Sequence, residues 1–127
     1  MYLLLDTHAL LWWATADSAL STRARSRITH SEEVFVSAAS AWEISIKVSL
    51  GGIPSALDPL SDFEGSLRIH GFKILPITAA HGIRAGMLPG PHKDPFDRML
   101  IAQAQAENMA IVSNDAVFDN YGVRRVW

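Results

Sequence analysis

The chain has 127 residues, no cysteine and a formal net charge of −2 at pH 7. This length predicts a single domain, residues 1–127, with a core of its own. The lack of cysteine excludes a disulfide framework and a zinc–thiolate site, and 49% hydrophobic against 19% charged residues exclude a disordered chain. The charge gives no support to a nucleic-acid binder with a basic surface. It does not exclude a nuclease, because divalent cations reverse the local sign of an acidic cleft.

The amino-terminal stretch MYLLLDTHALLWWATAD has no basic segment and carries Asp6 early, so it does not fit a signal peptide. No apolar run approaches the roughly 18 residues needed to span a bilayer. We therefore expect a cytoplasmic protein with no membrane partner. The absence of cysteine agrees with a reducing compartment.

Short apolar runs and helix-like segments alternate along the chain, bounded by glycine, proline and polar breaks. The first half predicts a strand at Tyr2–Leu5, a helix at about Ala9–Ala16, a strand at Val34–Ser37, and a helix at about Ala41–Leu50 that stops at Gly51-Gly52. The second half predicts a helix at Pro59–His70, a strand at Phe72–Ile77, helices at Ala79–Met87 and about Pro95–Glu107, a strand at Ala110–Ser113, and an edge strand at Val123–Trp127.

Repeated alternation of strand and helix is typical of a parallel sheet covered on both faces. The strand runs are continuously apolar rather than alternating, as expected for strands buried on both sides. The sequence therefore predicts an α/β fold, a three-layer α/β/α sandwich with a central parallel sheet.

Acidic residues follow the predicted strands. Asp6 comes directly after the first strand, Glu43 lies in the helix after the second, and Asp115 follows Ala110–Ser113. The carboxyl ends of parallel strands share one edge of the sheet, where ligands bind. Helices that return to a parallel strand begin at that same edge, so Asp97 can join the cluster. We expect these carboxylates to converge.

Helix capping also explains each acid taken alone. Ser40-Ala-Trp-Glu43 fits a capping box. Asp94 before Pro95 fits an N-cap with proline at N1, which makes Asp97 an N3 acid favoured by the helix dipole. The two remaining acids, Asp6 and Asp115, can cap the helices that follow them.

A cluster of carboxylates, by contrast, calls for a cation, because neighbouring like charges disfavour ionisation. Clustered carboxylates on one edge with no lysine or histidine nearby in sequence would call for a divalent metal ion. Oxygen-only ligation points to Mg²⁺ or Mn²⁺ rather than to zinc.

Three stretches resemble the PIN domain family, and more closely the VapC-type toxin ribonucleases of toxin–antitoxin pairs. They are LLDTHALLWW (Leu4–Trp13), SAASAWEISIKVSLGG (Ser37–Gly52) and HKDPFDRMLIAQAQAENMAIVSND (His92–Asp115). Each is short and degenerate, but their joint order and spacing are specific, and with the order of strands the resemblance covers essentially the whole chain.

The resemblance implies four catalytic and metal-binding acids. Asp6 matches the aspartate that ends the first strand, and Glu43 matches the glutamate of the helix after the second. Asp97 matches the aspartate of a D-x-x-x-x-A-x-A helix, and Asp115 the aspartate of a Thr/Ser-x-Asp turn, in which serine replaces the more frequent threonine. Auxiliary roles are open for four neighbours: Thr7, Asp94, Arg98 and Ser113.

Each auxiliary residue has two possible roles, one structural and one in the site. Asp94 is expected mainly to cap and orient the helix of Asp97, and Arg98 either to contact phosphate or, preferably, to balance the local acids. Thr7 and Ser113 can hydrogen-bond a carboxylate or water, or serve in caps and turns. Three nearby basic side chains could contact substrate: His8, His92 and Lys93. They could equally have a structural role or simply be exposed to solvent.

The implied activity is Mg²⁺- or Mn²⁺-dependent hydrolysis of RNA phosphodiester bonds, leaving 5′-phosphate and 3′-hydroxyl ends. The implied partners are an RNA substrate, a cognate antitoxin protein and a second copy of the chain in a homodimer. The adjacent Trp12 and Trp13 diverge by about 100° on a helix, so either one lines an interface or both are buried between helices. The alternative function is a catalytically silent PIN-like module that binds RNA or protein.

Overall fold

The computed structural model describes residues 2–51, 62–90 and 92–127. Their strands form one sheet in the order β3-β2-β1-β4-β5, and every neighbouring pair is parallel. The chain places β2 and β3 on one side of β1, and β4 and β5 on the other. The topological switch point therefore lies between β1 and β4, which is the position at which α/β sheets bind ligands. The strands are β1 Tyr2–Leu5, β2 Glu33–Ser37, β3 Lys73–Leu75, β4 Ala110–Val112 and β5 Arg125–Val126.

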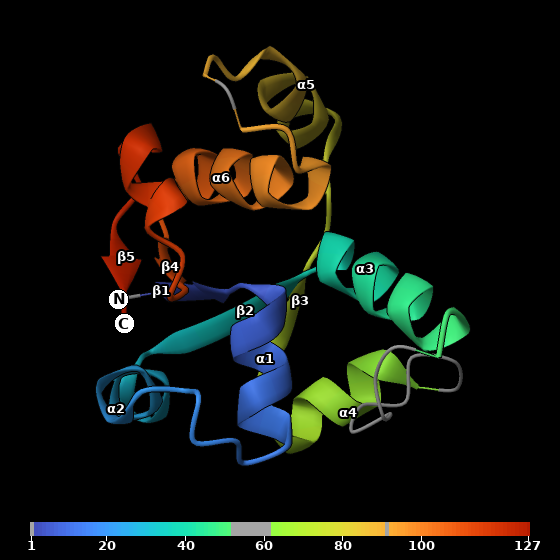
Figure 1. The fold of residues 1–127 in the computed structure, drawn as a ribbon, viewed down its shortest axis with the longest axis vertical. Helices are drawn as coiled ribbons and strands as arrows, with labels where there is room; N and C mark the ends of the chain where they lie inside the picture. Colours follow the sequence, from blue (N-terminus) through green and yellow to red (C-terminus); the bar gives the residue numbers. More distant parts are fainter. Residues whose placement is uncertain (1, 52–61, 91) are drawn as a thin grey trace.

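Helices cover both faces of this sheet (Figure 1). In the view of Figure 1, α1, α2 and α4 lie below the sheet, α6 lies above it, and α5 packs on the outer side of α6. The prediction of a three-layer α/β/α sandwich with a parallel sheet is confirmed. The helices are α1 Thr7–Ala14, α2 Thr22–His30, α3 Ala38–Ser49, α4 Phe63–Ile69, α5 Ala79–Met87, α6 Pro95–Glu107 and the 3₁₀ helix η1 Ala116–Tyr121.

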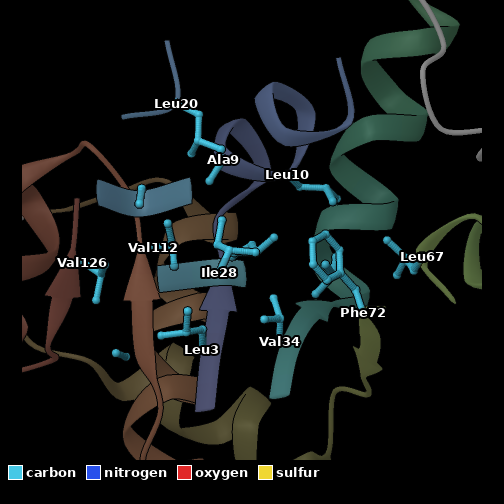
Figure 2. Packing of buried hydrophobic residues seen from close by; sticks show 14 of the residues in the cluster. Leu3, Ala9, Leu10, Leu20, Ile28, Val34, Leu67, Phe72, Val112 and Val126 are labelled. Carbon is cyan, nitrogen blue, oxygen red and sulfur yellow. The ribbon is translucent and has the colours of Figure 1, made fainter. Parts of the chain in front are cut away.

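Successive residues of β1 point to opposite faces of the sheet and build two cores. Leu3 packs with α1 and α2 on one face, as Figure 2 shows beside Ala9 and Ile28. Leu4 packs on the other face with Leu100 of α6. Because all three leucines of β1 are fully buried, both faces of the central strand are sealed. No helix in the described part of the chain is long and apolar enough to cross a membrane.

The predicted elements agree with the structure in kind and differ at their ends. The helices Ala79–Met87 and Pro95–Glu107 are confirmed, and β5 lies at an edge as predicted. The strand predicted at Phe72–Ile77 is shorter, and the helix predicted from Ala9 already starts at Thr7. Two predicted features, Gly52 at a helix stop and Pro59–Ser61 at a helix start, lie outside the described residues.

One helix was not predicted. The segment TRARSRITH forms α2, and only Ala24 and Ile28 of it are buried. Ser21 caps its amino terminus by accepting a hydrogen bond from the Ala24 N–H at 3.0 Å. Two buried residues in nine give a weak apolar periodicity, which is why the pattern was missed.

The capping box predicted at Ser40–Glu43 is wrong. Helix α3 begins three residues earlier than expected, and Ser37 is its N-cap, accepting from the Ala39 N–H at 3.0 Å. Glu43 therefore lies in the second turn, where no free N–H is available to it. Its carboxylate is directed instead toward α1, which brings it to the edge of the sheet that carries Asp6.

Candidate active site

The ends of three neighbouring strands define the edge at which the site lies. Leu5 of β1 is paired with Val36 of β2 on one side and with Val112 of β4 on the other. The strands therefore end at one level, and the residues that follow them emerge side by side. The Asp6 N–H continues the ladder by donating to the Val112 carbonyl at 3.1 Å.

The four predicted acids line one pocket of about 520 Å³ at this edge. Asp6 comes from the end of β1, Glu43 from α3, Asp97 from the first turn of α6, and Asp115 from the turn after β4. The convergence expected from the parallel sheet is therefore present. The same pocket is lined by seven further residues: Thr7, His8, Trp12, Asp94, Asn114, Ala116 and Phe118.

Asp6 is the most buried of these acids, with 7% of its surface exposed. Burial raises the pKa of its carboxyl, against hydrogen bonds from Ser113 and from the Ala9 N–H, which lower it. The Ala9 N–H lies 2.7 Å from Oδ1 of Asp6, so the predicted cap of α1 is confirmed. Asp6 is thus both a helix cap and a wall of the pocket, and the two readings do not exclude each other.

Ser113 links two acids. Its side chain hydrogen-bonds Asp6, and its Oγ accepts from the Asp115 N–H at 3.0 Å. Because Ser113 is fully buried, this link has a fixed geometry. Asp115 also caps η1, as predicted, by accepting from the Val117 N–H at 3.0 Å.

Glu43 is held at both carboxylate oxygens. Thr7 Oγ1 donates to Oε1 at 2.7 Å, and Lys47 Nζ lies 3.2 Å from Oε2. Thr7 Oγ1 and Ser40 Oγ are 2.9 Å apart. Since the single hydroxyl hydrogen of Thr7 goes to Glu43, Ser40 is the donor in the second bond. This buried chain of hydroxyls fixes Glu43 relative to α1.

Asp97 faces a histidine. Nε2 of His92 lies 2.8 Å from Oδ2 of Asp97, and both side chains are about one-fifth exposed. Burial raises the pKa of Asp97, and the nearby charges of Asp94 and Asp6 raise it further, whereas the hydrogen bond from His92 lowers it. Asp94 caps α6 as predicted, accepting from the Phe96 N–H at 2.9 Å and the Asp97 N–H at 3.4 Å.

The guanidinium of Arg98 donates to three backbone carbonyls, those of Ala85, Leu88 and His92. These bonds fasten the segment between α5 and α6, a structural role that the sequence did not predict. The predicted roles of Arg98, contact with phosphate or balance of the local acids, stay predictions. The His92 N–H is in turn 3.3 Å from the hydroxyl oxygen of Tyr121, to which it donates.

The expectation of carboxylates without basic neighbours is also corrected. Lys47 and His92 each contact one of the four acids. The sequence carried a signal for the first pair, since Glu43 and Lys47 have the i,i+4 spacing of a helical ion pair. It gave no comparable signal that His92 would turn toward Asp97.

The donor set suits a hard divalent cation, since carboxylate oxygens from four elements line one pocket. In the part of the chain that the structure describes, however, no three His, Asp or Glu side chains are grouped closely enough to hold one ion. Two of the four acids are directed at Thr7, Lys47 and His92 instead. Holding an ion would require rotation of side chains that already stand around the pocket.

A comparison with known families decides the affiliation of the chain. Residues 3–123 match the model of the PIN domain, which covers almost all of the sequence. The chain belongs to the PIN domain family. A curated relative, Ribonuclease VapC22 of Mycobacterium tuberculosis, is 31% identical to this PIN domain over 113 residues, which are 88% of this chain and 85% of the relative.

Solved structures share the fold. VapBC2 of Rickettsia felis, in a complex bound to a DNA fragment from its promoter, superposes on this PIN domain with a TM-score of 0.70 at 16% identity, covering both chains fully. FitAcB of Neisseria gonorrhoeae gives a TM-score of 0.69 at 18% identity, covering 97% of this chain and 95% of the other. VapC20 of Mycobacterium tuberculosis, described as a toxin that cleaves the sarcin–ricin loop, gives 0.64 at 16% identity and 95% coverage of each.

Proposed function

We propose that this PIN domain is an endoribonuclease that requires Mg²⁺ or Mn²⁺, and that it is the toxin of a toxin–antitoxin pair. The observation that carries the proposal is the meeting of Asp6, Glu43, Asp97 and Asp115 in one pocket at the switch point of the sheet. A curated relative of similar length is a ribonuclease, which supports the assignment of the substrate class.

These four acids would hold the cation. When bound, a divalent cation lowers the pKa of a coordinated water and offsets the negative charge that builds on the phosphoryl oxygens. The chain's own residues prepare the pocket for this chemistry. Thr7 and Lys47 fix the carboxylate of Glu43, Ser113 ties Asp6 to the Asp115 turn, and the cap at Asp94 aims the first turn of α6.

Asp97 is the acid that we assign to positioning the attacking water. Asp97 lies in the first turn of α6, and about one-fifth of its side chain is exposed. It can therefore reach both the pocket and an RNA strand that lies across the pocket. The His92 imidazole occupies Oδ2 and leaves Oδ1 for water or cation. No nucleophilic side chain of the protein is required, because the oxygen of water would form the new bond to phosphorus while the bond from phosphorus to the 3′-oxygen breaks and that oxygen leaves as a hydroxyl.

The proposed protein partners are a cognate antitoxin and a second copy of the chain. One structural neighbour, from Klebsiella pneumoniae, is described as a toxin–antitoxin complex, and it supports the proposal of an antitoxin partner. Helix α3 and its C-cap offer apolar surface to such a partner, since three side chains spaced four residues apart are exposed: Trp42, Ile46 and the C-cap Leu50.

The test is cleavage of total cellular RNA by the purified chain with Mg²⁺ or Mn²⁺, compared with EDTA. Asp97→Asn removes the proposed ligand, and Asp119→Asn is the matched control, because Asp119 pairs with Arg125 outside the pocket. We expect metal-dependent cutting that survives Asp119→Asn and falls more than about 100-fold in Asp97→Asn, since even the outer partners of a metal ligand are worth about 10- to 100-fold.

The second candidate is a catalytically silent binding module. It is favoured by one observation, that the described acids are not gathered around a single point. Absence of cutting by folded wild-type protein with either metal ion would support this candidate. Equal cutting by wild type and Asp97→Asn would contradict the role proposed for Asp97 and leave it a role in the first turn of α6 alone.

A further inference from the structure

A group of aromatic rings borders the acidic pocket. His8 and Trp12 are four residues apart on α1, so they project from one face of the helix. Both line the pocket together with Asp6, and their ring centroids are 5.6 Å apart with planes tilted by 32°. The ring of Trp127 backs Trp12 at 5.8 Å and 60°. We call these three residues the aromatic ledge.

Trp13 shows what a tryptophan with a structural task looks like in this protein. It packs against Phe72 at 5.6 Å, lies under the Arg25 guanidinium at 5.4 Å, and donates from Nε1 to Nδ1 of His70 at 3.2 Å. Packing accounts for its ring, and a hydrogen bond accounts for its polar end. Trp13 does not line the acidic pocket.

Core packing explains only part of the aromatic ledge. Trp12 is half-buried, packs against the core and joins α1 to Trp127 near the carboxyl terminus. His8 is exposed, and its ring lies beside that of Trp12 with the two planes tilted. An exposed ring beside a half-buried ring at the mouth of a pocket contributes little to the folded state. It provides an aromatic face to a ligand that enters the pocket.

Such a face would help to hold an RNA strand here. The pocket is lined by five carboxylates, those of Asp6, Glu43, Asp94, Asp97 and Asp115, which repel the phosphates of an RNA strand wherever no divalent cation offsets their charge. The chain as a whole is also slightly acidic, so long-range attraction does not compensate. Stacking of a base on an aromatic ring requires no positive charge and accepts every base, and it strengthens binding roughly 10- to 100-fold per base.

We propose that the aromatic ledge is a base-binding subsite, in which one base of an RNA strand stacks on His8 and Trp12. The stacked nucleotide then adjoins the phosphodiester that is presented to the acids, because Asp6 caps α1 two residues before His8, and both line the pocket with Trp12. This subsite rests on the proposed ribonuclease function and adds to it a means of placing the strand. It predicts recognition of a nucleotide outside a duplex, since a base within a duplex has both faces covered by its stacked neighbours.

The test is a double-mutant cycle, in which one change is a substitution in the protein and the other is the removal of one base from the RNA. An RNA containing the cleavage site mapped with the wild type is compared with copies that carry a single abasic nucleotide on either side of the cut. His8→Ala removes the exposed ring with little effect on folding, Trp12→Leu removes the inner ring while keeping an apolar side chain, and Trp13→Phe is the matched control. The readout is kcat/KM, with folding of each variant checked by thermal melting.

We expect one abasic position to lower kcat/KM of the wild type and of Trp13→Phe about tenfold. The same loss of base should have little further effect in His8→Ala or in Trp12→Leu, because the surface on which it stacks is gone. An abasic penalty that persists undiminished in both ledge variants would overturn the proposal, as would the lack of any abasic penalty in the wild type. No cleavage by the wild type would remove the proposed function and the subsite with it, an outcome distinct from active cleavage with unchanged penalties.

Discussion

Nε2 of His92 lies 2.8 Å from Oδ2 of Asp97, which ties the segment before α6 to an acid of the candidate site. Facing an ionised carboxylate, Nε2 carries the hydrogen and donates it. The backbone of His92 is itself held from two sides, by the Tyr121 hydroxyl at 3.3 Å and by Arg98 Nη1 at 3.0 Å. Because the backbone of His92 is held in place, the His92 side chain fixes the position of the Asp97 carboxylate.

His92→Ala should lower metal-dependent cleavage about tenfold, in the range found when the outer partner of a metal ligand is lost. His92→Gln, which keeps an N–H donor, should recover part of that loss. The measurement is kcat/KM on one defined RNA at saturating metal. Wild-type activity in His92→Ala would show that Asp97 needs no partner.

Stability without metal should depend on pH through the buried acids. Burial raises the pKa of Asp6 and Asp97 above the ordinary value of 3.8. Between pH 3.8 and the raised pKa of each carboxyl, the folded state binds more protons than the unfolded state. The contribution of Asp6 and Asp97 to stability is therefore present below about pH 4 and is lost as pH rises through the raised pKa.

Asp6→Asn should remove the part of the pH dependence of stability that comes from Asp6. The substitution should keep the cap of α1, because asparagine caps as well as aspartate. In EDTA, the variant should gain stability relative to wild type as pH rises above about 4. Chemical unfolding at a series of pH values measures this difference. A difference that does not change with pH would contradict the burial of a charged Asp6.

Arg98→Ala should lower the free energy of unfolding by about 2–3 kcal/mol, because three carbonyls lose a charged donor. Arg98→Lys should recover little, since an ammonium group cannot reproduce the planar fork. Arg84→Ala is the control, because Arg84 is exposed and makes one hydrogen bond of 3.3 Å to Gln105. If Arg98→Ala leaves unfolding unchanged but weakens RNA binding, the phosphate reading is right after all.

Thr7→Val should reduce cleavage about tenfold with little loss of fold, since valine keeps the shape but removes the donor to Glu43. Thr7→Ser keeps the hydroxyl and should behave like the wild type. Comparable activity in both variants would mean that Lys47 alone holds Glu43 in place.

The parallel sheet and the meeting of the acids were predictable from the sequence, whereas the order of the strands within the sheet was not. Continuous apolar runs indicate strands buried on both faces, and parallel strands bring their carboxyl ends to one edge. This rule placed Asp6 and Asp115 together although more than a hundred positions separate them. The start of α3 was misplaced because both Ser37 and Ser40 are good caps, and tertiary packing selected the first.

The partners of the acids were not predictable. Thr7 meets Glu43 from another helix, and His92 reaches Asp97 through a non-helical segment whose path depends on Arg98 and Tyr121. Such contacts arise from the packing of elements and leave no periodicity in the sequence. The spacing of Glu43 and Lys47 did carry a signal, because the two lie on one helix.

The most direct test of the account is Mn²⁺ binding followed by electron paramagnetic resonance, in the absence of RNA. Wild type, Asp97→Asn and Asp119→Asn are titrated under one condition, with folding confirmed for each. We expect wild type and Asp119→Asn to bind Mn²⁺ alike, and Asp97→Asn to bind it at least tenfold more weakly. Equal binding by all three, or none by the wild type, would contradict the claim that the acidic pocket is a divalent-cation site.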